Sequence, residues 1–558
     1  MKSNKTINTA IYYHPEAYTI SGPKLMGRNA VGESFIRGFL SYCSNSEFWA
    51  QIENREHGIA FAKAVTTLGR NESVRLVDRH SLAALSEPGV IYYPGPGIGQ
   101  HAWHRATHGH ASWSLCGITH TTSSTGAMDS LVELLTAPVQ PWDAVICTSS
   151  AVKDNVNRVL QAEVDRLKER LGVQKIILPQ LPVIPLGIHT DDFRFTQLQK
   201  QKARTAIDAD ENTHVVLYMG RLSFHAKAHP LAMYQALQKA AQKLPKGERI
   251  LLVECGWFSN EFIEQAYIDA SREAAPSVKV VRLDGRKAED RQTAWASADI
   301  FCSLSDNIQE TFGIVPIEAM AAGIPVVVSD WDGYKDTVRN GVDGFRVPTL
   351  MPQAGLGNDL AYRHALGIDN YDMYCGHACS LVAVDIEAAA RSFSDLFASK
   401  DLREKMGSAG EQRAKEMYDW SVIIPQYEQL WAQLTEIRLA EKDGVKSAAH
   451  SWPARMDPFH AFGSYPTTIL KQETRVELVD NTVEAALARV EQYGNLKMVD
   501  YAKFVLPTDD EVKIIIGKAA LGTTNAGDLI KDIPQKRQAY VFRALVWLVK
   551  LGILRPEK

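Results

Sequence analysis

Cysteine is scarce in this sequence, with seven residues in 558, and the seven are scattered. An odd number of cysteines without a CxxC pair argues against a disulfide framework and favours a reducing compartment. Only Cys375 and Cys379 lie close together, around His377. Because a zinc site needs more ligands at a recognisable spacing, we expect reduced thiols in an ordered loop here and no metal.

Long apolar runs and an excess of charge are also missing. No stretch approaches the ~20 apolar residues that cross a bilayer, and the strand-like residues 10–13 follow Met1 without the apolar core of a signal peptide. Lys and Arg number 61 against 65 Asp and Glu, a net charge of -4, which predicts no general nucleic-acid-binding surface. These absences predict a cytoplasmic protein and leave peripheral membrane contact open.

Short β-branched or aromatic runs alternate with helical patterns in two successive halves of the chain. Such alternation predicts parallel sheets joined by helices, an α/β fold. The strand-like runs are residues 90–93, 144–147 and 176–178 in the first half, and 215–219, 250–253, 278–283, 300–302 and 326–329 in the second. A chain of this length holds about three domains at the usual ~150 residues each. We predict Rossmann-like domains over 1–185 and 186–420, a crossover helix over 421–440, an extended linker over 441–479 and a small domain over 480–558.

The most specific pattern in the chain follows residue 310. Gly313 stands where a loop enters a helix, and residues 315–322 are good helix formers. Gly323 and Pro325 end the helix, and residues 326–328 form a buried strand. The segment is therefore predicted to be a loop, a helix, a turn and a strand in succession.

The start of this helix is a predicted phosphate site. Unpaired N–H groups and the positive end of the dipole meet at a helix N-terminus, where they attract anions. The residues placed to use this field are Thr311, Phe312, Gly313 and Ile314. Glu310 and Glu318 are about two helical turns apart, so that both carboxylates can face one cleft. One carboxylate at a reacting sugar and the other at a ribose would suit a nucleotide-sugar donor.

These residues resemble the E-x7-E signature of the retaining glycosyltransferases of family 4. Upstream, residues 215–219 followed by Gly220, Arg221 and Lys227 resemble that family's strand, Gly-Arg pair and lysine. Residues 183–189 resemble its interdomain segment, with His189 where Asp is commoner, and residues 298–301 and 333–344 continue the likeness. The resemblance covers roughly residues 10–435. It implies the GT-B fold, two Rossmann-like domains facing a cleft, with the acceptor on domain 1–185 and the donor on domain 186–420.

Site roles follow from the same resemblance. Gly220, Arg221 and Lys227 would hold the donor diphosphate, Glu310 the sugar hydroxyls and Glu318 the ribose. For Glu318 the alternative is a helix charge favoured by the dipole. Since two cations and the helix amides can neutralise a leaving diphosphate, we expect no metal and no other cofactor. Residues 330–332, Asp-Trp-Asp, imitate a metal motif of a different glycosyltransferase fold, and we expect no metal there.

The first half supplies two further candidates. His120 ends a strand-like run and precedes hydroxyl residues, so its ring can donate into a cleft. In the family a histidine at the corresponding place contacts the donor sugar, and we predict His120 to be catalytic together with Arg221, Lys227 and Glu310; a structural histidine is the alternative. Residues 22–33 resemble the family's glycine loop, in which Gly27 would let the backbone approach phosphate, and a simple tight turn stays equally open.

Two segments fall outside the family pattern. Residues 350–379, rich in Asn, Asp, Tyr and His, are predicted to be an insertion that either borders the active site or decorates the surface. Residues 480–558 show apolar positions at helical spacing and resemble a winged helix. Their basic residues are interrupted by Asp528 and Asp532, so a protein partner or a homo-oligomer is favoured over nucleic acid.

The predicted function is a retaining glycosyltransferase. It would move a sugar from a nucleotide-sugar donor to a glycan, lipid-linked or other acceptor in polysaccharide or glycoconjugate synthesis. A phosphorylase or a nucleotide-sugar epimerase on the same scaffold is one alternative. Another is a non-catalytic assembly or regulatory protein that acts through its C-terminal domain. The presence of Arg221, Lys227, Glu310 and Glu318 argues against the last alternative.

Overall fold

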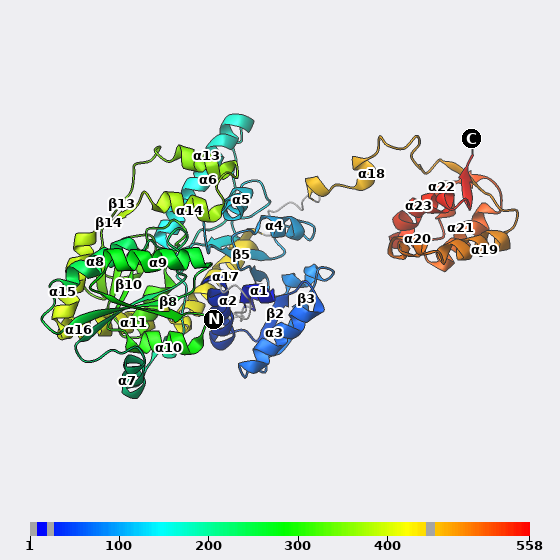
Figure 1. Cartoon of the computed structure of the whole chain (residues 1–558). Coiled ribbons are helices and arrows are strands. Elements are labelled where there is room, and N and C mark those ends of the chain that lie inside the picture. Colours follow the sequence, from blue (N-terminus) through cyan, green and yellow to red (C-terminus); the bar gives the residue numbers. More distant parts are fainter. Residues whose placement is uncertain (1–7, 19–26, 442–451, 558) are drawn as a thin grey trace. The chain divides into compact units, whose positions relative to one another are not determined.

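A computed structural model describes residues 8–18, 27–441 and 452–557 (Figure 1). The chain divides into two compact units, Met1–Trp452 and Pro453–Lys558. Among the helices of the described residues, none has the length and apolar content needed to cross a membrane.

The first sheet has six parallel strands in the order β3-β2-β1-β4-β5-β6. The strands are β1 Ala10–Tyr12, β2 Glu47–Gln51, β3 Ser73–Val77, β4 Val90–Tyr92, β5 Ser114–Ile118 and β6 Ala144–Ile146. Helices between them are α1 Pro15–Tyr18, α2 Gly27–Tyr42, α3 Arg55–Thr67, α4 Gly99–Ala106, α5 Thr125–Glu133 and α6 Ser150–Leu171. Strands β4, β5 and β6 are buried along their whole length, as expected of parallel strands covered by helices on both faces. This order is that of the Rossmann fold.

One strand expected in this half is absent. Residues 176–178 form no strand, and the chain meets the sheet only through isolated bridges at Gln180 and Val183. Ile177 and Leu178 are exposed. Pro179 and Pro182 lack the N–H group that a continuous ladder needs, so an apolar run there does not become a strand.

The second sheet repeats the first. Its six parallel strands lie in the order β12-β11-β10-β7-β8-β9, which is the same connectivity counted from β7. The strands are β7 Thr213–Met219, β8 Arg249–Gly256, β9 Lys279–Asp284, β10 Ile300–Ser303, β11 Val326–Ser329 and β12 Gly344–Val347. The helices are α7 Gln197–Ala206, α8 Leu231–Ala241, α9 Glu261–Ala274, α10 Ala288–Ser297, α11 Ile314–Ala321, α12 Tyr334–Thr337, α15 Ile386–Ala398 and α16 Lys400–Arg413. Two Rossmann-like domains of the GT-B type are therefore confirmed.

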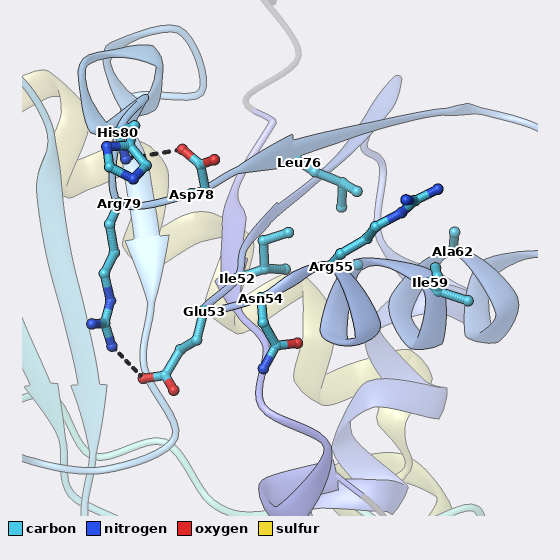
Figure 2. A pocket seen from close by; sticks show the side chains of 11 residues that line it. Ile52, Glu53, Asn54, Arg55, Ile59, Ala62, Leu76, Asp78, Arg79 and His80 are labelled. Atoms are coloured by element: carbon cyan, nitrogen blue, oxygen red, sulfur yellow. Dashed lines mark hydrogen bonds and ion pairs between the residues drawn. The ribbon is translucent and has the colours of Figure 1, made fainter. Parts of the chain in front are cut away.

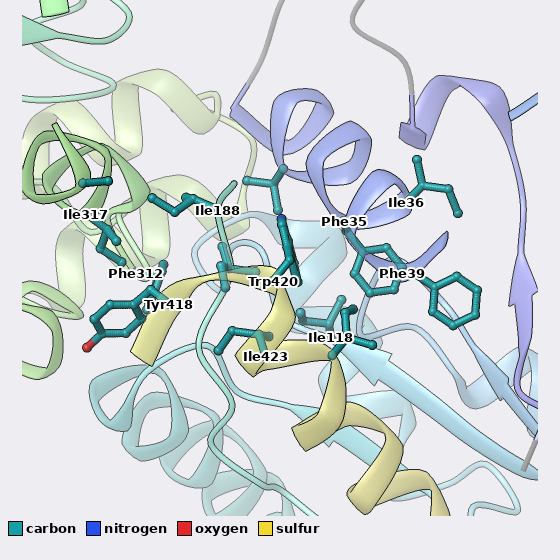
Figure 3. Close-up of a cluster of buried hydrophobic side chains, with 14 of the residues drawn as sticks. Phe35, Ile36, Phe39, Ile118, Ile188, Phe312, Ile317, Tyr418, Trp420 and Ile423 are labelled. Atoms are coloured by element: carbon teal, nitrogen blue, oxygen red, sulfur yellow. The ribbon is translucent and has the colours of Figure 1, made fainter. Parts of the chain in front are cut away.

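Helix α17 (Trp420–Glu441) crosses back onto the first domain and packs against α2. Its first residue, Trp420, is fully buried, and its indole Nε1 donates to Ser34 Oγ over 2.8 Å. Trp420 belongs to one hydrophobic cluster that contains Phe35 and Ile118 of the first domain and Phe312 of the second (Figure 3). The core of this unit is therefore continuous between the domains and reaches the loop before α11.

The predicted insertion forms two short strands and two helices. Strands β13 (Thr349–Leu350) and β14 (Ala383–Val384) pair antiparallel. Between them lie α13 (Asn358–Ala365) and α14 (Tyr371–Cys379). Pairing of β13 with β14 brings the ends of the insertion together beside the second sheet.

The C-terminal unit is mainly helical, as predicted. It contains α18 Pro458–Ala461, α19 Val483–Gly494, α20 Lys497–Asp500, α21 Asp509–Ala519, α22 Ala526–Leu529 and α23 Gln535–Lys550. A three-stranded antiparallel sheet, β16-β15-β17, consists of Thr524–Asn525, Arg475–Leu478 and Leu554–Pro556. The hydrophobic core of the C-terminal unit includes Val476, Ile515 and Leu545. The resemblance to a winged helix and the role in protein contact stay predictions.

Candidate active site

The predicted phosphate loop leaves the carboxyl end of β7. Gly220 directly follows the strand, and its N–H donates to the Cys255 carbonyl over 3.0 Å. Arg221 comes next, half-buried, with Nη2 donating to the Ala226 carbonyl over 2.6 Å. This bond folds the loop onto itself and fixes the stem of Arg221. The carboxyl ends of parallel strands are where ligands bind in doubly wound sheets.

Lys227 and Glu310, 83 positions apart in sequence, form an ion pair. Lys227 Nζ lies 2.6 Å from Glu310 Oε2, and the two side chains are 23% and 10% exposed. Burial alone would raise the pKa of Glu310, but the Lys227 charge and backbone N–H groups of Thr311 and Phe312 offset it, so the pKa lies below its ordinary value. Glu310 is therefore an ionised carboxylate that already faces an ammonium group.

Helix α11 begins beside this pair. Its N-cap residue, Gly313, has φ 79° and ψ 71°, a left-handed conformation that favours glycine. No side chain in the described part of the protein caps this helix start, so its first N–H groups are available to an anion. Glu310, Thr311, Phe312, Gly313 and Ile314 thus form one continuous turn that ends in a helix N-terminus.

The first domain meets this turn at His120. Thr311 Oγ1 donates to the His120 carbonyl over 3.1 Å, and Ser149 Oγ donates to the Thr311 carbonyl over 2.8 Å. His120 lies two residues beyond β5 and is half-buried. The structure therefore brings the predicted histidine to the loop that carries Glu310.

Glu318 and Gly27 are placed apart from these contacts. Glu318 lies in the second turn of α11, and no hydrogen bond or ion pair of the described residues joins it to the Lys227–Glu310 pair. Burial raises its pKa to about 7, an effect that the Arg291 charge only reduces. Gly27 is the first residue of α2. Of the predicted glycine loop, residues 22–26 lie outside the described residues and residues 27–33 belong to α2.

The raised pKa of Glu318 predicts a pH dependence of stability. An unfolded glutamate ionises near pH 4.5 and the folded one near 7, so the unfolded state gains stabilisation as pH rises through this window. The contribution of Glu318 to the free energy of unfolding is therefore fully present below about pH 4.5, decreases as the pH rises to 7, and is constant above pH 7. The glutamine of Glu318→Gln cannot ionise. Between pH 5 and pH 8 we therefore expect the free energy of unfolding of this variant to fall by about 2 kcal/mol less than that of the parent protein. Urea unfolding at both pH values measures this; parallel profiles would contradict it.

Two further residues, Asp332 and Ser149, lie beside the site; Asp332 belongs to the Asp-Trp-Asp segment in which no metal is expected, and the sequence patterns did not predict Ser149. Asp332 has φ 44°, and its carboxylate Oδ1 lies 3.3 Å from Ser149 Oγ. Burial and then the Glu310 charge raise the pKa of Asp332 to about 8. Ser149 is the N-cap of α6 and lies three residues after the end of β6. A serine N-cap at the carboxyl end of a parallel strand was the signal that could have found it.

Metal-binding groups are not assembled around these residues. In the ranges that the structure describes, no three or more His, Cys, Asp or Glu side chains are arranged to hold a metal ion. Asp330 and Arg346 are an ion pair at 3.4 Å, and His377 Nδ1 lies 3.0 Å from an Asp369 oxygen. Asp330 and His377, which belong to the sequence motifs that imitate metal sites, thus each contact another side chain of the protein.

A separate cavity of about 500 Å³ lies at the carboxyl ends of β2 and β3 (Figure 2). Ile59, Ala62 and Leu76 form its apolar side, and the Glu53–Arg79 ion pair, at 3.5 Å, lies on its polar side. None of the predicted site residues lines it. The cavity therefore belongs to the first domain alone.

Residues 199–354 match the family model described as glycosyl transferases group 1. D-inositol 3-phosphate glycosyltransferases of Mycobacterium bovis and Mycobacterium tuberculosis are 27% identical over 193 residues, which is 35% of this chain and 38% of theirs. The chain thus aligns with little more than a third of the length of these curated relatives.

Similar solved structures include two bacterial proteins. HepE of Anabaena, crystallised with UDP, is 16% identical, covers 76% of this chain and 99% of its own, and has a TM-score of 0.48. Sucrose-phosphate synthase of Thermosynechococcus elongatus is also 16% identical, covers 77% of this chain and 99% of its own, and has a TM-score of 0.45. Over residues 199–354, which hold the Lys227–Glu310 pair and Glu318, this chain is thus similar to the group 1 glycosyl transferases.

Proposed function

We propose that this chain is a retaining, nucleotide-sugar-dependent glycosyltransferase of family 4. The observation that carries the proposal is the Lys227–Glu310 pair, which joins the loop after β7 to the turn before α11. A cation, an ionised carboxylate and an uncapped helix start lie together at the carboxyl edge of one Rossmann-like sheet. That combination suits a diphosphate attached to a sugar.

Charge stabilisation of the leaving group is the chemistry that these residues can supply. Lys227, Arg221 and the first amides of α11 would bind the two phosphates and stabilise the negative charge that develops as the bond to the sugar breaks. Glu310 would accept hydrogen bonds from the sugar hydroxyls, and Glu318, neutral below about pH 7, would face the ribose. These cations and amides would therefore bind the charged transition state more tightly than the bound donor.

Retention would follow from attack on the same face as the departing phosphate. The acceptor hydroxyl would approach from the first domain, beside His120, and its proton would pass to the phosphate oxygen that leaves. No covalent enzyme intermediate is part of this proposal. The acceptor would be a glycan or a lipid-linked sugar, and peripheral membrane contact would bring a lipid-linked acceptor within reach.

Thermal unfolding in the presence of nucleotide sugars tests the proposed function. A ligand that binds only the folded state at 100 times its Kd adds about 2.7 kcal/mol of stability, which for a domain of this size raises Tm by roughly 5–10 °C. We expect one of UDP-, GDP-, ADP- or dTDP-sugars to give such a shift, and Glu310→Ala to reduce it. Release of free nucleotide with the same donor, detected by chromatography, is the second readout. No shift and no nucleotide release with any donor would contradict the proposal.

A further inference from the structure

The helix pair α13–α14 contacts the loop that carries Arg221 and Lys227. Gly376, in α14, lies so close to that loop that a Cβ added there would meet the Cβ of His225 at 2.8 Å. One turn later, Cys379 Sγ donates to the Phe224 carbonyl over 3.8 Å. Asn307, which precedes Glu310, donates from its side chain to the His225 carbonyl over 3.1 Å. The middle of the phosphate loop is thus held between α14 and the turn before α11.

The same helix pair contacts the first domain directly after His120. The Tyr371 hydroxyl, at the start of α14, lies 3.5 Å from Thr121 Oγ1 and 3.4 Å from Ser123 Oγ. His364 Nε2, near the end of α13, lies 3.2 Å from Thr125 Oγ1. Three hydroxyl residues within five positions therefore face the insertion.

A buried carboxylate fixes α13 and α14 to each other. Asp369 lies in the turn between them, 4% exposed, and accepts two hydrogen bonds of 2.8 Å from Arg363 of α13. His377 Nδ1 of α14 lies 3.0 Å from the same carboxylate. Asn370 caps α14 by accepting from the Met373 N–H over 2.9 Å. These bonds hold Tyr371 in a defined place relative to Gly376.

We propose that Tyr371 is a positioning residue, which holds the His120 loop (residues 120–125) in register with the phosphate loop (residues 220–228). The hydroxyl can donate to one of Thr121 and Ser123 and accept from the other. One rigid helix would thereby set the distance between the donor phosphates and the histidine on the opposite domain. Of the two roles open to this insertion, bordering the site is the one that these contacts favour. The inference rests on the proposed function for its catalytic consequence, and on the contacts alone for its structural consequence.

The structural consequence is tested without any substrate. Tyr371→Phe removes only the hydroxyl, and Tyr362→Phe is the matched control, because Tyr362 lies in α13 and is 64% exposed. We expect hydrogen–deuterium exchange of the His120 loop to become at least about threefold faster in Tyr371→Phe, since that loop loses a contact to the helix. Exchange there should stay unchanged in Tyr362→Phe. Equal exchange in both variants would overturn the proposal whether or not the chain transfers sugar.

The catalytic consequence is tested with the donor found by thermal unfolding. Misplacement of a reacting group by about 1 Å can cost two orders of magnitude in rate, and loss of the two long hydrogen bonds of the Tyr371 hydroxyl should cost less, about tenfold in kcat. The KM for donor should stay within about twofold, because the phosphate loop keeps its contacts. The fraction of donor hydrolysed instead of transferred should rise. Unchanged kcat in Tyr371→Phe would overturn the positioning role while leaving the proposed function intact.

A second variant tests the contact with the phosphate loop. Gly376→Ala places a methyl group against His225, and its control, Gly517→Ala in α21, adds the same methyl group in open space. Both substitutions favour a helix, so loss of folding is not expected. We expect Gly376→Ala to raise the donor KM about fivefold and Gly517→Ala to leave it unchanged. Identical KM values in the two variants would show that α14 does not set the phosphate loop.

Discussion

Lys227→Ala is expected to lower kcat about 1,000-fold. Loss of one preorganised group that stabilises developing charge typically costs 10²–10³ in rate, about 3–4 kcal/mol. Lys227 is at the upper end of this range because its ammonium is mostly buried, where charge interactions are weakly screened. Arg221 is not expected to make up for the loss, since in the proposed clamp it already binds the diphosphate, and its Nη2 also donates to the Ala226 carbonyl. Initial rates at saturating donor measure the effect.

Stability must be separated from turnover in this experiment. Removal of Lys227 leaves Glu310 as a buried carboxylate without its ammonium partner, which typically costs 3–5 kcal/mol. Rates are therefore compared at a temperature where melting curves show both proteins to be folded. Lys246→Ala, which removes an exposed lysine of the same domain, is the control and should keep full activity. A folded Lys227→Ala protein with kcat within about threefold of the parent would refute the phosphate clamp.

Local patterns were enough to predict most of the second domain. Residues 326–328 are apolar and β-branched, and with Ser329 they form β11, in which all four residues are buried. The expected helix 315–322 corresponds to α11, Ile314–Ala321. Gly323 has the positive φ that is common just after a helix end. These features depend on residues close together in the chain, so a single sequence contains the information.

Contacts between distant segments were not predictable in the same way. Thr121 and Tyr371 are 250 positions apart, and no periodicity connects them. The pKa of Asp332 is raised by burial that only the folded arrangement produces. Conversely, residues 176–178 have the composition of a strand, but Pro179 and Pro182 prevent the ladder. The resemblance to family 4 predicted that Lys227 binds phosphate. Its 2.6 Å contact with Glu310 could be seen only in the folded structure.

Gly313→Ala is expected to destabilise the second domain strongly. A Cβ at this position would meet Tyr334 Cε1 at 1.9 Å and Cδ1 at 2.4 Å. The ring cannot move aside easily, because Tyr334 is 2% exposed and its hydroxyl is 2.8 Å from Ser303 Oγ. Left-handed strain adds to the clash, and together they should cost about 3–4 kcal/mol. The apparent Tm should fall by roughly 8–12 °C.

Gly341→Ala separates the two causes of this loss. Gly341 has φ 76°, close to the 79° of Gly313, but a Cβ there would meet no atom within 4 Å. Its substitution therefore carries the backbone strain alone, about 1 kcal/mol, and should lower Tm by only about 2–4 °C. Equal shifts in the two variants would mean that Tyr334 yields to the methyl group. A larger shift in Gly313→Ala, accompanied by loss of the donor-induced rise in Tm, would show that the close packing of Gly313 against Tyr334 also sets the helix start that is proposed to hold phosphate.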